Sequence, residues 1–169
     1  KNIKCKKFEN LSLLHINRPH KHTALSLATL TELDLALDKS AIDDDVKVIA
    51  FTGEGEKAFA AGSDLSEVKD RGLKKALEPI IQGLADKMEK TPKPIIAAIN
   101  GICMGGGLEI ALGCDLRIAS ENAVFATPEG KIGIIHGGGA TARLLRIVGR
   151  GLCMEILLMG DTINDEKEV

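Results

Sequence analysis

Two glutamates in this chain each follow a feature that could hold a polarised carbonyl group. Glu109 ends a segment with three consecutive glycines, residues 100–109, and Glu129 follows Pro128. A second glycine-bearing loop, residues 57–65, lies upstream. Addition of water to an activated double bond needs one group that takes a proton, one that gives a proton, and donors that hold the enolate oxygen. A pair of carboxylates and two loops with free backbone N–H groups could perform this chemistry.

The two glycine loops each allow a functional and a purely structural interpretation. Residues 61–63 precede a helical pattern that begins at Asp64, and a loop that enters a helix leaves N–H groups free for an anion or an oxyanion. The alternative is a simple turn capped by Asp64. Residues 105–107 also precede a helical pattern, and here the alternative is close packing of a helix on a strand. Their spacing differs from GxGxxG, so we predict no dinucleotide site.

Two acidic residues and one histidine are candidates for proton transfer. Glu109 stands in an otherwise apolar helical segment, residues 106–112, where a carboxylate is rarely ordinary surface. An exposed helix edge is the alternative. Glu129 could instead be an acid favoured by a helix N-terminus. His136 could carry a proton or be an ordinary loop residue. The other histidines have no metal-ligand spacing, so we predict no metal site.

Composition argues against several classes of protein. The chain of 169 residues has a formal net charge of −2, four Phe, and no Trp or Tyr, which argues against a nucleic-acid partner. No stretch approaches the roughly 18 apolar residues of a membrane span, and no signal peptide is visible. The four cysteines form no CxxC pair, which favours buried, reduced thiols. We therefore expect a cytoplasmic protein without membrane association; if a leader has been removed, the mitochondrial matrix is the alternative.

Apolar periodicity predicts strands that alternate with helices, which indicates an α/β fold with parallel pairing. The expected strands are a hairpin of residues 3–8 and 11–16, and runs at residues 46–51, 95–99 and 116–119. The expected helices span residues 26–41, 73–90, 106–112, 141–148 and 152–159. Ser26 is the predicted N-cap of the first helix, Pro79 is predicted to end or kink the second, and Gly149 is predicted to cap the fourth.

Taken together, these segments resemble the crotonase superfamily, that is, the enoyl-CoA hydratase/isomerase family. The resemblance covers nearly the whole chain. The matching segments are NRPHKHTAL (17–25), TG (52–53), FAAGSDL (59–65), PKPIIAAING (92–101), GGGLE (105–109), CDLR (114–117), and FATPEGKIG (125–133) on to RL (143–144). Each segment is modest evidence alone, whereas their common order and spacing are strong evidence.

The resemblance implies a crotonase-like spiral of ββα units with two roughly perpendicular sheets. The substrate would be an acyl thioester of coenzyme A, and no cofactor would be bound permanently. Backbone N–H groups of Ser63 and Gly106 would form the oxyanion hole. Glu109 would activate a water, Glu129 would give a proton to the α carbon, and Gly137 would help to hold the water. The residues expected to bind coenzyme A are Lys21, Ala24, Ala61, Gly62, Asp64 and Leu65.

Glutamates at both acidic positions are typical of the hydratases in this family. The resemblance therefore implies an enoyl-CoA hydratase, which adds water syn to a trans-2-enoyl-CoA and gives a 3-hydroxyacyl-CoA. A Δ3,Δ2-enoyl-CoA isomerase or a specialised acyl-CoA dehydratase is the alternative on the same scaffold. A non-catalytic oligomerising or RNA-binding homologue is an alternative of another class, as is an anion-binding α/β domain outside the family.

Two features depart from the family pattern. His136 stands where hydratases of this type usually have Pro, so it could alter the choice of substrate or the reaction. Family members usually continue beyond the position of Val169, with helices that cover the acyl pocket and build a trimer. We therefore expect a single crotonase-like core domain, residues 1–169, that lacks those helices and exposes apolar surface. A full-length protein would be a homotrimer or hexamer.

Overall fold

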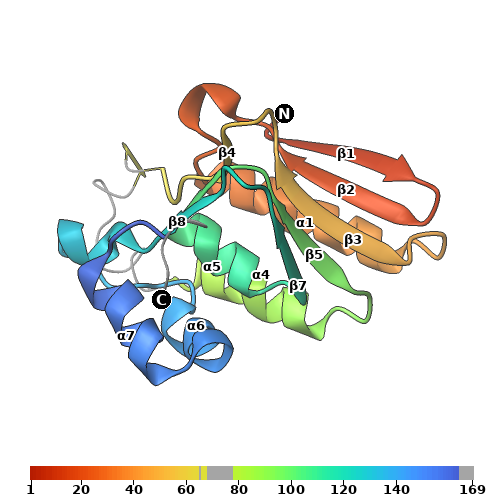
Figure 1. The fold of residues 1–169 in the computed structure, drawn as a ribbon. Coiled ribbons are helices and arrows are strands. Elements are labelled where there is room, and N and C mark those ends of the chain that lie inside the picture. The colour runs from red at the N-terminus through yellow and green to blue at the C-terminus, as the bar shows by residue number, and fades with distance from the viewer. Residues whose placement is uncertain (65, 68–77, 164–169) are drawn as a thin grey trace.

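The computed structural model, which describes residues 1–64, 66–67 and 78–163, contains two sheets (Figure 1). The larger sheet has the strand order β1-β2-β3-β5-β7. Its strands are β1 (Ile3–Phe8), β2 (Leu11–Ile16), β3 (Val48–Gly53), β5 (Ile95–Ile99) and β7 (Leu116–Ala119). β1 and β2 form the expected antiparallel hairpin, and the other neighbours pair in parallel. The predicted α/β class with parallel pairing is confirmed.

The smaller sheet is parallel and has the order β4-β6-β8. Its strands have three residues each: β4 (Ala58–Ala60), β6 (Ile102–Met104) and β8 (Val124–Ala126). Each follows a strand of the larger sheet, so the chain passes from the larger sheet to the smaller one three times. Helical segments follow each crossing, which gives the repeated strand–strand–helix order of the predicted spiral. Strands of three residues are too short to show an alternation of apolar and polar side chains. The sequence patterns therefore did not predict where these strands begin and end.

Asn100 and two glycines allow the chain to pass between the sheets. The Asn100 side chain accepts a hydrogen bond from the Gly53 N–H at 3.1 Å and donates to the Gly53 carbonyl at 3.0 Å. A Cβ on Gly53 would overlap the Ala58 carbonyl, and a Cβ on Gly101 would overlap the Lys57 carbonyl. Only glycine fits where the backbones approach so closely.

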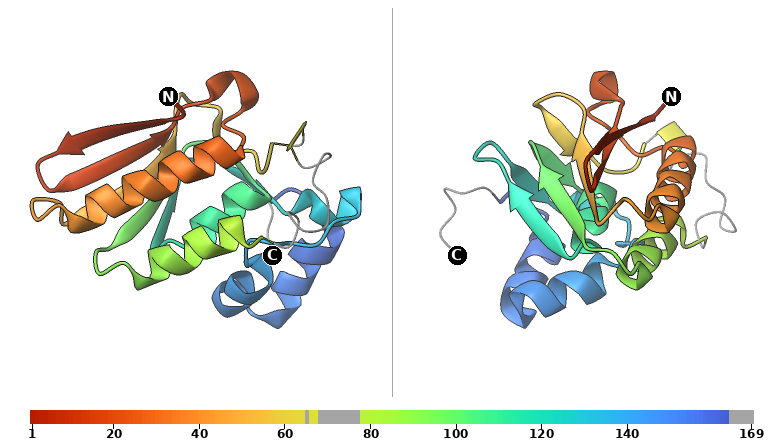
Figure 2. Two further views of the ribbon diagram at one scale, coloured as in Figure 1. Left: turned by 180° about the vertical axis from the view of Figure 1, so that it is seen from behind. Right: turned by 90° about the vertical axis from the view of Figure 1, so that its right-hand side faces the viewer.

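Helices cover one face of the larger sheet and surround one short buried helix. α1 (Leu27–Ile42) and α4 (Ile80–Lys90) lie side by side on one face of the larger sheet (Figure 2). α5 (Gly106–Leu112) is buried along its whole length. α6 (Ala140–Val148) and α7 (Arg150–Met159) pack on each other next to α5. Two short 3-10 turns, η1 (Pro19–Lys21) and η2 (Pro128–Ile132), complete the described elements.

The predicted helix ends are largely confirmed. Ser26 caps α1, because its Oγ accepts a hydrogen bond from the backbone of the first turn at 3.2 Å. Gly149 has a φ of +77° and ends α6, as predicted. Pro79 stands immediately before α4, so it precedes the helix rather than kinking it. The earlier part of that prediction, residues 73–77, lies outside the described residues. α7 begins at Arg150 and not at residue 152.

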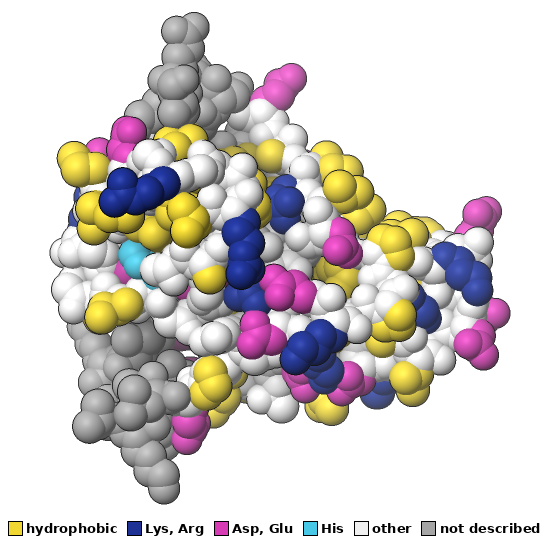
Figure 3. Space-filling model, turned by 90° about the horizontal axis from the view of Figure 1, so that it is seen from below, with side chains coloured by type: hydrophobic (Ala, Val, Ile, Leu, Met, Phe, Trp, Pro, Cys, Tyr) yellow, Lys and Arg dark blue, Asp and Glu magenta, His cyan; other side chains and the backbone are white. Residues whose placement is uncertain are grey.

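The hydrophobic core lies between the larger sheet, α1 and α4, and it continues around α5. Several apolar side chains of α6 and α7 are exposed: Leu145, Ile147, Met154, Leu158 and Met159. Figure 3 views the side of the molecule on which these two helices lie, and it shows hydrophobic side chains dispersed among charged ones. Three of the four free cysteines are buried as expected, but Cys5 is exposed because it lies on the edge strand β1.

Candidate active site

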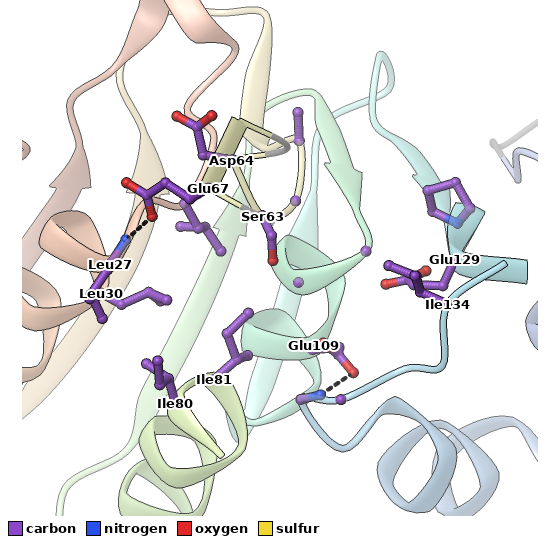
Figure 4. A pocket seen from close by; sticks show the side chains of 18 of the residues that line it. Leu27, Leu30, Ser63, Asp64, Glu67, Ile80, Ile81, Glu109, Glu129 and Ile134 are labelled. Carbon is purple, nitrogen blue, oxygen red and sulfur yellow. Dashed lines mark hydrogen bonds between the residues drawn. The ribbon is translucent and has the colours of Figure 1, made fainter. Parts of the chain in front are cut away.

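A pocket of about 660 Å³ lies between the N-terminal end of α5, the start of α4 and η2 (Figure 4). All five residues predicted to act on the reacting atoms line it: Glu109, Glu129, Ser63, Gly106 and Gly137. They come from four separate parts of the chain. The fold therefore gathers the two carboxylates and the two glycine loops around one cavity.

The backbone of Ser63 presents a free N–H group beside Gly106. Leu25 pairs with the residues that flank Ser63, since its N–H donates to Gly62 at 2.8 Å and its carbonyl accepts from Asp64 at 2.9 Å. In parallel pairing the N–H of Ser63 then points away from Leu25. No hydrogen-bond partner for this N–H occurs in the described part of the chain.

Gly106 supplies a second free N–H group next to the first. It is the first residue of α5, and the first N–H groups of a helix have no partner within the helix. A Cβ on Gly106 would lie 3.6 Å from the Ser63 nitrogen and 2.7 Å from Cδ1 of Ile81. Glycine at this position therefore keeps space open in front of two neighbouring donors. Such a pair could hold an oxygen that gains negative charge.

Glu109 is a buried carboxylate whose one oxygen is fixed by two backbone donors. Its Oε1 accepts hydrogen bonds from the Gly138 N–H at 2.7 Å and the Ala140 N–H at 3.2 Å (Figure 4 shows the first). Ala140 begins α6, so its N–H is one of the free donors of a helix N-terminus. Such donors stabilise the charged form of a carboxylate. Oε2 accepts no hydrogen bond from the described residues, which leaves it available as a base.

Glu129 has the opposite surroundings. It is buried in η2, and a Cβ on Gly105 would lie 3.0 Å from its Oε1. Its Oε2 lies 3.4 Å from Nε2 of His136, yet neither atom has a hydrogen-bond partner among the residues that the structure describes. Burial raises the pKa of Glu129, and the negative charge of Glu109 adds to the rise, while a backbone hydrogen bond and His136 oppose it. This environment favours a carboxyl that keeps its proton.

Comparison with known proteins agrees with this geometry. The family model described as enoyl-CoA hydratase/isomerase matches residues 6–168. The chain belongs to the enoyl-CoA hydratase/isomerase family.

Curated and solved members of the family match the chain over nearly its full length. The short-chain-enoyl-CoA hydratase of Clostridium acetobutylicum is 39% identical over 98% of this chain, and the crotonyl-CoA hydratase of Syntrophomonas wolfei is 41% identical over 98%. The match spans 64% and 65% of those two proteins. The crystal structure of an enoyl-CoA hydratase from Bacillus anthracis superimposes with a TM-score of 0.94 at 37% identity, over 98% of this chain and 66% of that one.

In this enoyl-CoA hydratase/isomerase family member, the positions predicted to bind coenzyme A fall into three groups. Ala61, Gly62 and Asp64 line the pocket. Lys21 and Ala24 do not line the pocket. They lie beside residues 61–64, because η1 and the segment after it run next to that loop. Leu65 lies outside the described residues.

The Asp64 carboxylate connects the loop of residues 61–64 to η1 through hydrogen bonds and ion pairs. Its carboxylate accepts hydrogen bonds from Ser66 Oγ at 2.7 Å, Arg18 Nη2 at 2.9 Å and Lys21 Nζ at 3.3 Å. The hydrogen bond from Ser66, followed by that from Arg18, holds the pKa of Asp64 well below its usual range. Asp64 is therefore a permanent negative charge that fixes η1 against the loop of residues 61–64.

Apolar side chains form most of the remaining wall of the pocket, which also includes Glu67 and Glu78. The apolar side chains are Leu25, Leu27, Leu30, Ile80, Ile81, Ile132, Ile134 and Ile135. A pocket with an apolar wall and a few convergent polar groups is typical of a site for a small organic ligand. No group of His, Cys, Asp or Glu in the described part of the chain could hold a metal ion. Among the described helices, none is long and apolar enough to span a membrane.

Three residues that support the site were not among the site residues predicted from the sequence. Gly138 and Ala140 donate to Glu109, and the glycine run before a predicted helix was the signal that could have indicated them. Arg143 is buried in α6 and donates to Glu89 at 2.7 Å, to Asp86 at 2.5 Å and to the Gly138 carbonyl at 3.2 Å. It thereby holds the loop that holds Glu109. Arg143 belongs to a segment that carries the family resemblance, but the resemblance assigned it no role, and helical periodicity alone does not distinguish it from other arginines of amphipathic helices.

Proposed function

We propose that this protein is an enoyl-CoA hydratase, which adds water reversibly and syn to a trans-2-enoyl-CoA and gives a 3-hydroxyacyl-CoA. One observation carries the proposal. Glu109 is held by backbone donors that favour its charged form, whereas burial favours the protonated form of Glu129, and both line the same pocket as two free N–H groups. Two carboxyl groups whose surroundings favour opposite protonation states are suited to the roles of base and acid.

The proposed mechanism assigns one step to each group. Oε2 of Glu109 takes a proton from a water molecule, which the N–H of Gly137 helps to hold, and the water oxygen bonds to the β carbon. The thioester oxygen gains negative charge and is held by the N–H groups of Ser63 and Gly106, each worth about 10²–10³ in rate. Glu129 gives its proton from Oε1 to the α carbon. Proton exchange with solvent then restores both carboxyl groups.

We further propose how the substrate lies. The apolar wall receives the acyl chain, and the loop of residues 61–64 with Lys21 and Ala24 receives the coenzyme A portion, together with Leu65. The names of the two relatives above make short-chain substrates the first choice. Assembly as a trimer or hexamer and a single core domain stay predictions of the family resemblance. A location in the cytoplasm or the mitochondrial matrix stays a prediction from composition.

The direct test follows the loss of conjugated enoyl-thioester absorbance when the protein is mixed with crotonyl-CoA. We expect loss of absorbance with the wild-type chain. Removal of a general acid or base typically lowers a rate by about 10²–10⁴. We therefore expect Glu109→Gln and Glu129→Gln each to hydrate crotonyl-CoA at least about 10² times more slowly than wild type. A folded wild-type protein without hydration activity would contradict the proposal.

A second substrate separates hydration from isomerisation. One carboxyl that moves a proton between two carbons can isomerise a 3-enoyl-CoA without any water, and Glu129 with its unpaired Oε2 is the group that could do so. The same protein is therefore mixed with a 3-enoyl-CoA, and the appearance of conjugation is followed. Full hydration by Glu129→Gln would remove Glu129 from the hydratase mechanism.

A further inference from the structure

Two buried atoms that face each other lack any other partner. Oε2 of Glu129 and Nε2 of His136 are 3.4 Å apart, and both side chains are over nine-tenths buried, with 9% and 8% of their surface exposed. Neither atom has a hydrogen-bond partner among the described residues. Buried polar atoms are nearly always hydrogen-bonded, so an unpaired couple needs an explanation. A water molecule does not fit between atoms at this distance, so the two atoms face each other directly, and each is the polar partner that the described residues offer the other.

The 3.4 Å contact is a long and unaligned form of a hydrogen bond at a candidate catalytic residue. Such bonds are often long or poorly aligned in an empty site and tighten when the ligand is present. A small rotation of the imidazole or the carboxyl group would align Nε2–H with Oε2. His136 is not on the pocket wall, whereas Glu129 is. His136 can therefore reach a substrate only through Glu129.

The other charged groups near His136 and Glu129 either raise the pKa of Glu129 or form ion pairs with other residues. Glu109, on α5, faces Glu129 and raises its pKa. Lys131, in the same turn as Glu129, pairs with Asp161 at the exposed surface. Arg143 reaches the same loop from α6, but its guanidinium pairs with Asp86 and Glu89 of α4. No charge in the described part of the chain other than His136 pairs with Glu129.

We propose that His136 is a positioning residue for Glu129, to whose Oε2 it donates a hydrogen bond from Nε2. This keeps the transferable proton of Glu129 on Oε1. After Glu129 gives that proton to the substrate, the same bond stabilises the carboxylate that remains. The two groups then titrate as a coupled pair, and the pair sets the pH at which the proton donor is lost. The catalytic part of this inference rests on the proposed function, but the coupling itself does not.

The coupling is tested without any substrate. The chain has four histidines, so NMR can follow the imidazole signals against pH in the wild type and in Glu129→Gln. We expect the titration midpoint of His136 to be lower in the variant than in wild type, because the carboxylate that favours the charged imidazole is absent there. His15, which lies 3.1 Å from Glu54 elsewhere in the fold, is the internal control and should not move. An unchanged His136 midpoint overturns the proposal.

Two variants of His136 then test its effect on the reaction. His136→Gln keeps a donor without titrating, so we expect kcat close to wild type and loss of the histidine limb of the pH profile. His136→Leu removes the donor, and kcat should fall by about tenfold to a hundredfold, the size of one hydrogen bond to a charged group, with little change in KM. If histidine only fills space, the two variants fall together and the pH profile keeps its shape.

The two proposals fail in distinguishable ways. If the NMR titrations show the coupling and crotonyl-CoA is not hydrated, the His136–Glu129 pair stands and the hydratase assignment fails. If crotonyl-CoA is hydrated and the His136 midpoint is the same in wild type and Glu129→Gln, the hydratase assignment stands and the role of His136 fails.

Discussion

The same residue type occurs twice in the pocket with opposite surroundings. Glu109 lies on a buried helix, and two N–H groups from a distant loop fix its Oε1. Glu129 lies on a short 3-10 turn, and its Oε2 faces a histidine without a completed hydrogen bond. Backbone donors favour a charge, and burial disfavours it. This difference is the basis on which we propose Glu109 as the base and Glu129 as the acid.

The largest expected effect comes from the loop that holds Glu109. A Cβ on Gly138 would overlap Oε2 of Glu109 and lie 2.6 Å from Cγ2 of Ile81. Glu109 cannot move aside without losing its two hydrogen bonds. We therefore expect Gly138→Ala to lower the hydration rate by about 10²–10³, as for loss of the base itself.

A glycine in α4 supplies the matched control. A Cβ on Gly83 would meet nothing within 4 Å. Gly83→Ala should leave the hydration rate unchanged and stabilise the protein by about 0.5–1 kcal/mol, since alanine is the better helix former. Equal rates for the two alanine variants would contradict the role given to Gly138.

The next effect concerns Arg143, which connects the Glu109 loop to α4. Arg143→Met removes three hydrogen bonds, two of them to half-exposed carboxylates. We expect the free energy of unfolding to fall by about 1–3 kcal/mol and the hydration rate to fall by about tenfold. Urea unfolding and steady-state kinetics measure the two. Arg146→Met changes an exposed position on the same helix and should alter neither the stability nor the rate. If Arg143→Met were as stable and as active as wild type, the loop that holds Glu109 would not depend on Arg143.

The surroundings of Glu109 also show which parts of the site could be predicted from the sequence. The helix 106–112 and its buried glutamate were predictable, because a carboxylate among leucine, isoleucine and alanine is conspicuous. The glycine run before the predicted helix 141–148 could indicate free donors but not that they reach Glu109, since Gly138 lies 29 residues away and only the packing of α6 on α5 brings it near. The contact between Glu129 and His136 depends on how η2 and the following loop fold back. No periodicity reports such a contact.

Gly105 is the counterpart of Gly138 at the other carboxyl group, and the expected effect on activity is smaller. Gly105 has φ +50° and ψ −124°, a conformation that costs other residues about 1–3 kcal/mol. A Cβ there would lie 3.0 Å from Oε1 of Glu129, a side-chain atom that can shift by a few tenths of an ångström, since no distant loop fixes Glu129 as one fixes Glu109. Gly105→Ala should therefore lose stability in urea but keep the rate within about tenfold. A rate loss as large as that of Gly138→Ala would mean that Glu129 is held as rigidly as Glu109.

The last prediction compares stability against pH. Burial raises the pKa of Glu129 above its ordinary value of 4.5, so the folded state binds this proton more tightly than the unfolded state. The resulting stability is fully present below the ordinary pKa and is lost as pH rises through the raised pKa. Glu129→Gln cannot lose a proton, so its stability relative to wild type should increase with pH and level off above the raised pKa.

The matched variant at the other carboxylate should behave in the opposite sense. Glu109→Gln exchanges a charged acceptor of two N–H bonds for a neutral one, and hydrogen bonds to charged groups are the stronger kind. It should therefore be less stable than wild type at neutral pH, where Glu129→Gln is more stable. Urea unfolding of both variants between about pH 4 and pH 8 measures this. Shifts of the same sign would mean that the two carboxyl groups are stabilised alike, and the assignment of base and acid from their surroundings would be wrong.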